Sequence, residues 1–495
     1  MNLPIARHRS LPFGIIRRLL YIAVFMLAGA LLASCLAGVL YLDSQQDLSV
    51  WHTAFLDEEF TANSDIKTFK EYLAMEDRLF AQLDEKVYSA IEPAERKPVN
   101  RYSRGSLCDP ARWPTNWNHT IELTAPQPVA GVLLLHGLSD APYSLHSIGQ
   151  QLNASGAYVL GLRIPGHGTV PSGLIHTTWE DMAAAVQLAV KHLKEVVGDR
   201  PLYLIGYSNG GALAINYVFT SLEDDTSSRV AGVVLISPEI GLSKAAALAV
   251  WQARLGRLLG MPKLAWNSVL PEFDPYKYNS FAINAGDQAY RLTGEIQRQL
   301  TQCAKNGLLE QMPPILAFQS MADSTVLAPA LIENLLDRLP TGGHELVMFD
   351  TNRMKTISAT IDNRPRAQLI ALLDRTDLAY GVTLISNVSP SSLDVAAYQK
   401  RPGRAEKSVT PLSMTWPTDL YSLSHVALPF SSKDPLYGCC PETSGPGVQL
   451  GNVVLRGENG LLKINPAMLL RIRWNPFYDY LEQRVLGFID LTPES

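Results

Sequence analysis

Six short apolar runs, separated by longer amphipathic stretches, constrain most strongly how this chain can fold. The runs are VAGVLLL, AYVLGLRI, PLYLIGYS, VAGVVLISP, PPILAFQS and HELVMFD, and a typical intervening stretch is TTWEDMAAAVQLAVKHLKEVV. Continuous runs of Val, Leu and Ile are typical of parallel strands that helices cover on both faces. The sequence therefore predicts an α/β fold with a mostly parallel, doubly wound sheet. Ligands of such sheets bind where the carboxyl ends of the strands open.

Charge and composition narrow the classes of partner. Over 495 residues the formal net charge is −5, so the chain has no surplus of Lys and Arg to neutralise a nucleic-acid backbone. Apolar residues make up 47% of the chain and charged residues 18%, which is typical of a folded protein. We expect a globular protein that does not bind nucleic acid, and the oligomeric state stays open.

An uninterrupted apolar run over residues 19–42 predicts a transmembrane helix. Arginines lie in the basic segment 1–18 before it and acidic residues follow it, so the positive-inside rule places residues 1–18 in the cytoplasm. We expect an anchor in a bacterial inner membrane with the bulk of the chain on the periplasmic side. As an alternative, the sequence Leu-Ala-Ser-Cys resembles a lipoprotein processing site, and Cys35 would then carry the anchoring lipid.

The rest of the chain divides by composition. Residues 43–116 predict a helical spacer followed by a Pro-rich linker, and a single domain is expected over residues 117–495. Two stretches interrupt the alternation of strands and helices. The first, residues 239–311, predicts a helical cap, and the second, residues 351–415, includes a helical stretch and one extra strand without indicating a purpose.

The five cysteines show none of the paired spacings of a metal site. In an oxidising compartment Cys108 could pair with Cys439 or Cys440. The sequence does not fix this pairing, and ordinary free thiols are equally consistent with it.

The segment LYLIGYSNGGALAINYV carries the strongest chemical signal, because a predicted strand runs directly into a Gly-rich turn and then a helix. This is the pattern of a nucleophile elbow, in which a serine sits on a strained turn that only small neighbours allow. Ser208 is the predicted nucleophile, and Gly206 and Gly210 are the small neighbours.

A serine nucleophile also needs hydrogen-bond donors for the oxyanion that forms on the substrate. The strand VLLL leads into His136, Gly137 and Leu138. We expect the main-chain N–H groups of Leu138 and Asn209 to form this oxyanion hole. His136 is expected to be a structural residue of the turn.

Four motifs, HGLSDAPYS, LRIPGHGTVPSGL, GYSNGG and QSMADSTV, together resemble the α/β-hydrolases of the monoacylglycerol lipase and lysophospholipase group. Serine aminopeptidases of the same fold are near relatives. The resemblance covers residues 129–349 and a segment near His425. It implies an α/β-hydrolase fold with a cap, a Ser-acid-His triad, and no metal or organic cofactor.

In that family the acid follows the strand after the cap, and LAFQSMADSTVLAP places Asp323 there. The chain order Ser, acid, His leaves His344 and His425 as the base. His344 opens a predicted strand, whereas His425 lies in a loop-like segment, so His425 is preferred. The long interval between Asp323 and His425 departs from the family, and we attribute it to the second insertion, because lengthening a loop costs little entropy.

These features predict a membrane-anchored serine hydrolase that cleaves a lipid acyl ester, such as a monoacylglycerol or lysophospholipid, through an acyl-enzyme. Two other functions stay open. The same serine could serve a peptidase or an acyltransferase, or the fold could be a non-catalytic scaffold.

Overall fold

The computed structural model of the chain describes residues 13–44, 46–241, 262–323, 326, 328–354, 364–442, 445–451 and 471–491. The chain divides into two compact units, residues 1–48 and residues 49–495. The first unit contains one described helix, α1 (Phe13–Ser44), which includes the apolar run over residues 19–42. Among the described residues, no helix combines the length and hydropathy that crossing a bilayer requires.

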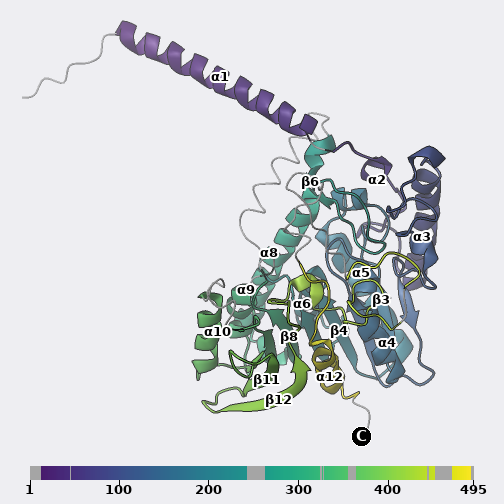
Figure 1. The fold of residues 1–495 in the computed structure, drawn as a ribbon, viewed down its shortest axis with the longest axis vertical. Coiled ribbons are helices and arrows are strands. Elements are labelled where there is room, and N and C mark those ends of the chain that lie inside the picture. The colour runs from purple at the N-terminus through teal and green to yellow at the C-terminus, as the bar shows by residue number, and fades with distance from the viewer. Residues whose placement is uncertain are drawn as a thin grey trace, which may run out of the picture. The chain divides into compact units, whose positions relative to one another are not determined.

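A ten-stranded sheet forms the centre of the second unit (Figure 1). Its strand order is β1-β3-β2-β4-β5-β8-β9-β10-β11-β12. The neighbours from β3 to β10 are parallel, whereas β1, β11 and β12 pair antiparallel. The strands are β1 (Ile121–Leu123), β2 (Gly131–Leu135), β3 (Tyr158–Leu162), β4 (Leu202–Tyr207), β5 (Gly232–Ile236), β8 (Ile315–Ser320), β9 (Glu345–Phe349), β10 (Gly381–Asn387), β11 (Asp394–Lys400) and β12 (Lys407–Thr415). The six apolar runs form β2, β3, β4, β5, β8 and β9, so the prediction of a mostly parallel sheet is confirmed.

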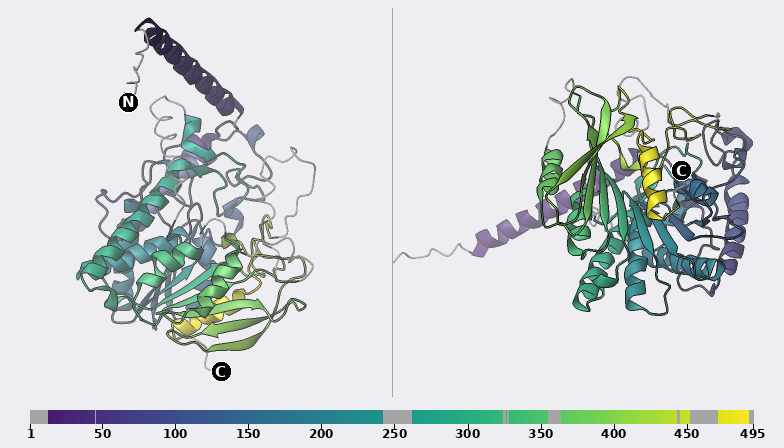
Figure 2. Two further views of the ribbon diagram at one scale, coloured as in Figure 1. Left: turned by 90° about the vertical axis from the view of Figure 1, so that its left-hand side faces the viewer. Right: turned by 90° about the horizontal axis from the view of Figure 1, so that it is seen from below.

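Helices cover both faces of this sheet. Successive strand residues point to opposite faces, and both faces carry apolar side chains that are buried. Val132 and Leu134 of β2 share a core cluster with Ile148 of α4 (His146–Ala154) and Leu481 of α12 (Tyr478–Phe488). Figure 2 shows α12, in yellow, alongside the strands. The helices α5 (Trp179–Val197) and α6 (Asn209–Glu223) contact β2 and β4 but contribute nothing to this cluster, so they cover the other face.

Residues 49–116 belong to the same compact unit as the sheet. They form short elements: α2 (Val50–Thr53), α3 (Phe69–Leu83), a π-helical turn η1 (Asp84–Tyr88) and the 3-10 turns η2 (Pro93–Glu95) and η3 (Pro110–Arg112). Thr68 begins α3 as its N-cap: its hydroxyl accepts from the N–H of Glu71, and the Glu71 carboxylate accepts from the N–H of Thr68. The apolar face of α3, which includes Tyr72 and Leu79, is buried.

The cap region between β5 and β8 is described from residue 262 onward. It contains the turn η6 (Pro262–Ala265), the hairpin of β6 (Trp266–Ser268) and β7 (Phe281–Ala282), the helix α8 (Ile283–Lys305) and the turn η7 (Leu309–Gln311). The helix α8 agrees with the helical cap predicted over residues 239–311, whereas residues 242–261 of that cap lie outside the described residues. Because α8 packs on α6, the described part of the cap is fixed to the helix that directly follows Ser208.

The second insertion extends the sheet. After β9 come α10 (Arg364–Asp374) and the strands β10, β11 and β12, which form one edge of the sheet. Asn352 joins the start of the insertion to its end: its N–H donates to the carbonyl oxygen of Tyr421 at 2.9 Å, and its side-chain amide donates to that of Leu420 at 2.9 Å. These bonds join the segment that enters the three added strands to the segment that leaves them. The chain therefore returns to the end of β9 after the added strands.

The remaining described helices and turns are η4 (Pro142–Leu145), η5 (Pro171–Ile175), α9 (Ala328–Asn334), η8 (Leu336–Arg338) and η9 (His425–Ala427). Cys108 and Cys303 are buried, Cys439 is half-buried and Cys440 is exposed, and no disulfide joins these four cysteines. The two vicinal sulfurs of Cys439 and Cys440 are 2.7 Å apart. Cys108 is therefore not joined to either of them in this structure.

Candidate active site

Ser208 lies on the turn between β4 and α6 with φ 53° and ψ −119°. A positive φ in a residue that carries a Cβ is strained, so the surrounding structure must hold it. The N–H of Ser208 donates to the carbonyl oxygen of Ile236 at 3.0 Å, and its own carbonyl oxygen accepts from the N–H groups of Gly211 and Glu239 at 2.9 and 3.0 Å. These bonds tie the turn to the end of β5 and fix the strained conformation.

The two flanking glycines leave room for this turn. A Cβ on Gly206 would lie 2.5 Å from the Cα of Gly211, and one on Gly210 would lie 2.5 Å from the carbonyl carbon of Leu135. No side chain fits at such distances from backbone atoms. The Gly-x-Ser-x-Gly pattern is thus required by the packing of the turn on β2 and on the start of α6.

Asp323 follows the carboxyl end of β8, as the sequence predicts. Its Oδ2 accepts from the hydroxyl of Ser237 at 2.8 Å and the amide of Gln319 at 3.2 Å, and its Oδ1 accepts from the N–H of Val326 at 3.0 Å. Burial raises the pKa of Asp323, but the hydrogen bond and charge of His425, together with the other donors, outweigh burial and lower it. The carboxylate is therefore held in its charged form.

His425 is the histidine that the structure brings to Asp323. Its Nδ1 lies 3.4 Å from Oδ1 of Asp323, and its side chain lines the same cavity as Ser208. The Ser320 hydroxyl holds the approaching chain by donating to the carbonyl oxygen of Leu423 at 2.6 Å. The loop that carries His425 is thus fixed to the end of β8, three residues before Asp323.

The rival base, His344, lies elsewhere. It is buried just before β9, and neither ring nitrogen has a hydrogen-bond partner among the described residues. Burial lowers its pKa to about 4. It does not line the cavity that contains Ser208, so this geometry favours His425.

The two predicted oxyanion donors flank Ser208. Asn209 is the first residue of α6, and Leu138 lines the cavity. A Cβ on Gly137 would lie 3.2 Å from the Cβ of Ser208, so the backbone before Leu138 approaches the nucleophile closely. The loop is held from the cap side, because the N–H of Tyr278 donates to the carbonyl oxygen of Ser139 at 2.8 Å.

His136 and His167 have structural surroundings. The Nδ1 of His136 lies 2.9 Å from the carbonyl oxygen of Gly137, and its Nε2 accepts from the N–H of Ile164 at 3.1 Å. Burial lowers the pKa of His136 well below its usual value, and it lowers that of His167 to about 4. Neither side chain lines the cavity among the described residues, as expected for turn-forming positions.

The cavity above Ser208 has a volume of about 320 Å³. Its described lining includes apolar side chains and several charged ones, which are Asp140, Glu239, Lys277, Arg471 and Arg473. Sequence reasoning did not single out any of these charged residues. Glu239 had a usable signal, since it follows the carboxyl end of a predicted strand, whereas the two arginines lie in a segment without a recognisable pattern. No cluster of His, Cys, Asp and Glu suited to a metal ion occurs in the described part of the chain.

Glu239 is a buried carboxylic acid that lines the same cavity as Ser208. It is 7% exposed, and its Oε2 makes no hydrogen bond to a described residue. Burial, and to a lesser degree the negative charge of Asp323, raise its pKa to about 7. Glu239 is therefore largely protonated in mildly acidic solution and charged in mildly alkaline solution.

Comparison with known families bears on residues 126–353, which match the family model described as serine aminopeptidase, S33. Residues 126–353 are an α/β-hydrolase domain. The expected resemblance to the monoacylglycerol lipase and serine aminopeptidase group is thereby confirmed. The matched region contains Ser208, Asp323 and the whole cap, and the domain's remaining strands β10 to β12 and His425 lie beyond it.

Two curated proteins are similar to parts of this chain. Phospholipase YtpA of Bacillus subtilis (strain 168) is 27% identical over 148 residues, which are 30% of this chain and 51% of that protein. The thermostable monoacylglycerol lipase of Bacillus sp. (strain H-257) is 32% identical over 85 residues, or 17% of this chain and 33% of that protein. The chain thus spans about half, or less, of the length of these relatives. The solved monoacylglycerol lipase of Paleococcus ferrophilus matches 47% of this chain and 88% of its own, with 21% identity and a TM-score of 0.36.

Proposed function

We propose that this chain is a serine hydrolase that cleaves carboxylic esters through an acyl-enzyme formed on Ser208. The observation that carries the proposal is the shared cavity: a strained serine and a histidine line it together, and a charged, buried aspartate contacts that histidine. This arrangement suits a nucleophile, a general base and an orienting acid.

In the proposed first step, the Ser208 hydroxyl adds to the ester carbonyl while Nε2 of His425 takes its proton. Asp323, at Nδ1 of the same ring, stabilises the imidazolium that forms. The main-chain N–H groups of Leu138 and Asn209 receive the oxyanion. Collapse of the tetrahedral intermediate breaks the bond to the alcohol oxygen, which leaves with the proton from His425. Water then takes the place of the alcohol: His425 accepts its proton as it adds to the acyl-enzyme, and Ser208 leaves with that proton. The mechanism needs no metal and no organic cofactor.

The lipid nature of the ester is part of the proposal. The named relatives include a phospholipase and a monoacylglycerol lipase. Leu138, Phe281, Val426 and Phe430 give the cavity apolar walls on which an acyl chain can pack.

The test is a fluorophosphonate probe and a chromogenic acyl ester, applied to the wild type and to Ser208→Ala, His425→Gln and His344→Gln. We expect Ser208→Ala to abolish labelling and both Ser208→Ala and His425→Gln to lower turnover by about 10⁴-fold or more. His344→Gln is the matched control, which should keep turnover near that of the wild type. Equal labelling of the wild type and Ser208→Ala would exclude Ser208 as the nucleophile. Parallel assays with aminopeptidase substrates and with alcohol acceptors compare ester hydrolysis with the peptidase and transferase alternatives.

We also propose attachment to the bacterial inner membrane, with the hydrolase domain in the periplasm. The support is the sequence alone, in the apolar run over residues 19–42 and the arginines before it. Carbonate extraction of membranes that contain the wild type or Cys35→Ala tests this location. Release of Cys35→Ala alone would favour the lipoprotein alternative, and release of both would exclude attachment.

A further inference from the structure

Three cationic side chains line the cavity that contains Ser208: Lys277, Arg471 and Arg473. They come from two distant parts of the sequence, the cap and the segment before α12. The fold has therefore gathered positive charge at one site next to Ser208, although no motif in the sequence indicates it.

Two of these cations have carboxylate partners. The ammonium group of Lys277 lies 2.7 Å from Oδ1 of Asp140. The guanidinium of Arg473 lies 3.5 Å from Oδ2 of Asp274, and that carboxylate also accepts from the Tyr437 hydroxyl at 2.7 Å. Asp274 is fully buried, so it holds Arg473 in place from behind the cavity wall.

Arg471 differs from the other two. It is exposed, it lines the cavity, and no carboxylate among the described residues lies within ion-pair distance of it. Its charge reaches the nucleophile turn: burial raises the pKa of Tyr207, the residue before Ser208, and the charge of Arg471 opposes that rise. Arg471 thus gives the cavity a cation that forms no ion pair with a described carboxylate.

The remaining carboxyl group of the cavity does not contact these cations. Among the described residues Glu239 forms no ion pair with any of the three, and burial and the charge of Asp323 raise its pKa to about 7. Since Asp140 pairs with Lys277 and Asp274 with Arg473, Arg471 is the cavity cation that has no carboxylate contact in the described part of the chain.

We propose that the cavity selects acyl esters whose alcohol part carries an anionic group, a phosphate or a carboxylate, which Arg471 binds with support from Arg473 and Lys277. The inference rests on the proposed ester hydrolysis at Ser208. A guanidinium binds both anions through paired hydrogen bonds, which a neutral glycerol group cannot match in charge.

The same wall orients the substrate. An acyl chain gains nothing from lying against three charged groups, so it packs on Leu138, Val426 and Phe430 instead. The alcohol part then points toward Arg471, and the ester carbonyl lies between the two ends beside Ser208.

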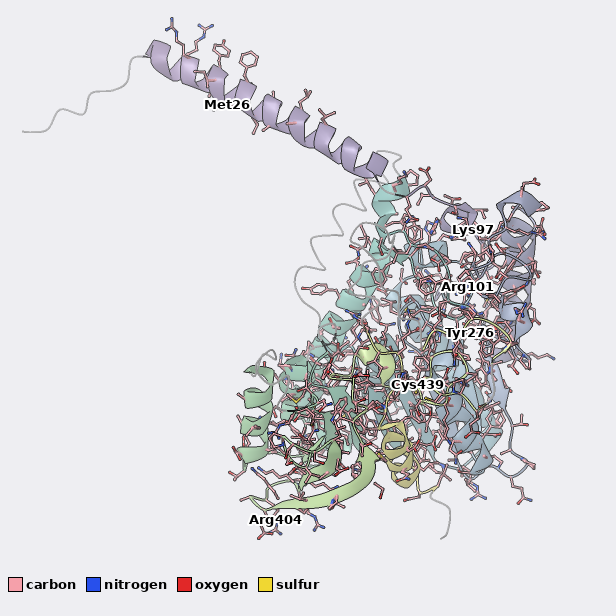
Figure 3. All side chains as sticks on the ribbon, in the orientation of Figure 1. Met26, Lys97, Arg101, Tyr276, Arg404 and Cys439 are labelled. Atoms are coloured by element: carbon pink, nitrogen blue, oxygen red, sulfur yellow. The ribbon has the colours of Figure 1, made fainter. Side chains whose placement is uncertain are left out.

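The test uses three esters of one acyl chain: 1-octanoylglycerol 3-phosphate, 3-octanoyloxypropanoate and neutral 1-octanoylglycerol. All three are assayed with the full chain below their micelle concentrations, so that surface charge on aggregates plays no part. The variants are Arg471→Gln, Arg471→Lys and the control Arg404→Gln. Arg404 is an exposed arginine in the turn between β11 and β12 (Figure 3), and it does not line the cavity.

We expect the wild type to hydrolyse at least one anionic ester with a lower KM than 1-octanoylglycerol. Arg471→Gln should raise the KM for that ester by about 10- to 100-fold, the usual effect of losing one charged hydrogen bond, without changing the KM for the neutral ester. Arg471→Lys should recover part of the loss, and Arg404→Gln should match the wild type. Preference for the phosphate or for the carboxylate identifies the head group.

The two proposals fail in different ways. Equal KM values for the three esters, or an Arg471→Gln effect of the same size on all of them, would overturn the head-group inference while leaving Ser208-dependent hydrolysis intact. If none of the three esters is hydrolysed in a way that depends on Ser208, the proposed function itself is overturned.

Discussion

Charged side chains gather both around Arg163, where residues 49–116 meet the sheet, and at the cavity beside Ser208, but their contacts differ between the two regions. Arg163 is fully buried and contacts Glu59 at 2.9 and 3.1 Å and Glu76 at 3.0 Å. In the cavity, Oε2 of the buried Glu239 has no hydrogen-bond partner among the described residues, and Arg471 has no carboxylate partner among them.

The difference separates structural charge from charge that is available to a ligand. Around Arg163 each of the three charged groups has hydrogen-bond partners, and Glu59 also accepts from the N–H of Gly166, which fixes the turn before His167. Such a closed network has nothing left to bind a ligand. An unmatched buried group costs stability, and this cost is expected where a site must keep capacity to bind.

The largest effect should come from breaking the matched network. Arg163→Met leaves the carboxylates of Glu59 and Glu76 buried without their cation, which should lower the free energy of unfolding by about 3–5 kcal/mol. Urea unfolding of the wild type and the variant, followed by tryptophan fluorescence, measures this free energy. The control is Arg78→Ala, which breaks the exposed ion pair with Glu58 and should cost about 0–1 kcal/mol. Similar losses in both variants would mean that the buried network is no different from a surface pair.

The second effect concerns the unmatched acid. The folded-state pKa of Glu239 is about 7, above the usual value of 4.5, so folding retains a proton that the unfolded chain releases. Below about pH 4.5 both states are protonated and no penalty exists. As the pH rises toward 7 the folded state loses stability, and above 7 the full penalty, on the order of 3 kcal/mol, is present.

Glu239→Gln should remove this penalty, because Gln does not titrate. Thermal unfolding of the wild type and the variant at pH 5 and pH 8 gives the change of stability with pH for each protein. The difference between these two changes measures the penalty, because the titrations that both proteins share cancel. The variant should gain on the wild type at pH 8. Parallel pH dependences would show that Glu239 finds a partner in solution.

The smallest effect should come from an uncharged polar group. Asn352→Ala removes the side-chain bond to Leu420 at the root of the second insertion and should lower the unfolding free energy by about 1–3 kcal/mol. Because that root leads to His425, kcat for an acyl ester should fall more than the KM changes. Ser392→Ala is the control: it removes the hydrogen bond from the Ser392 hydroxyl to Asp394, which lies between β10 and β11 and does not involve Asn352. An equal fall in kcat in both variants would count against a special role of the root.

The strands and the nucleophile turn could be predicted because their signals are local. A run such as VAGVLLL is buried on both sides wherever it lies, and the glycines around Ser208 are required by atoms two to five residues away or on the next strand. The same holds for Thr68 and Glu71 at the start of α3, whose reciprocal hydrogen bonds are a local pattern.

The purpose of the second insertion could not be predicted, because a strand's neighbours are chosen by tertiary packing. One strand, β10, was visible in YGVTLISNV, but β11 and β12 were not, since β12 is largely exposed and lacks a buried pattern. The association of residues 49–116 with the sheet also depends on contacts across about 90 to 100 positions, such as those of Glu59 and Glu76 with Arg163.

The sequence alone determined the order of strands and helices and the serine on its tight turn, because each of these depends on neighbours along the chain. The resemblance to the hydrolase family indicated Asp323 after β8. Only the tertiary structure decided which histidine meets Asp323 and which charges face the cavity. Those outcomes depend on where distant segments close on one another: His425 lies about 100 positions beyond Asp323, and Arg471 lies about 260 beyond Ser208. Their pairing is set by the free energy of the whole fold rather than by any local pattern.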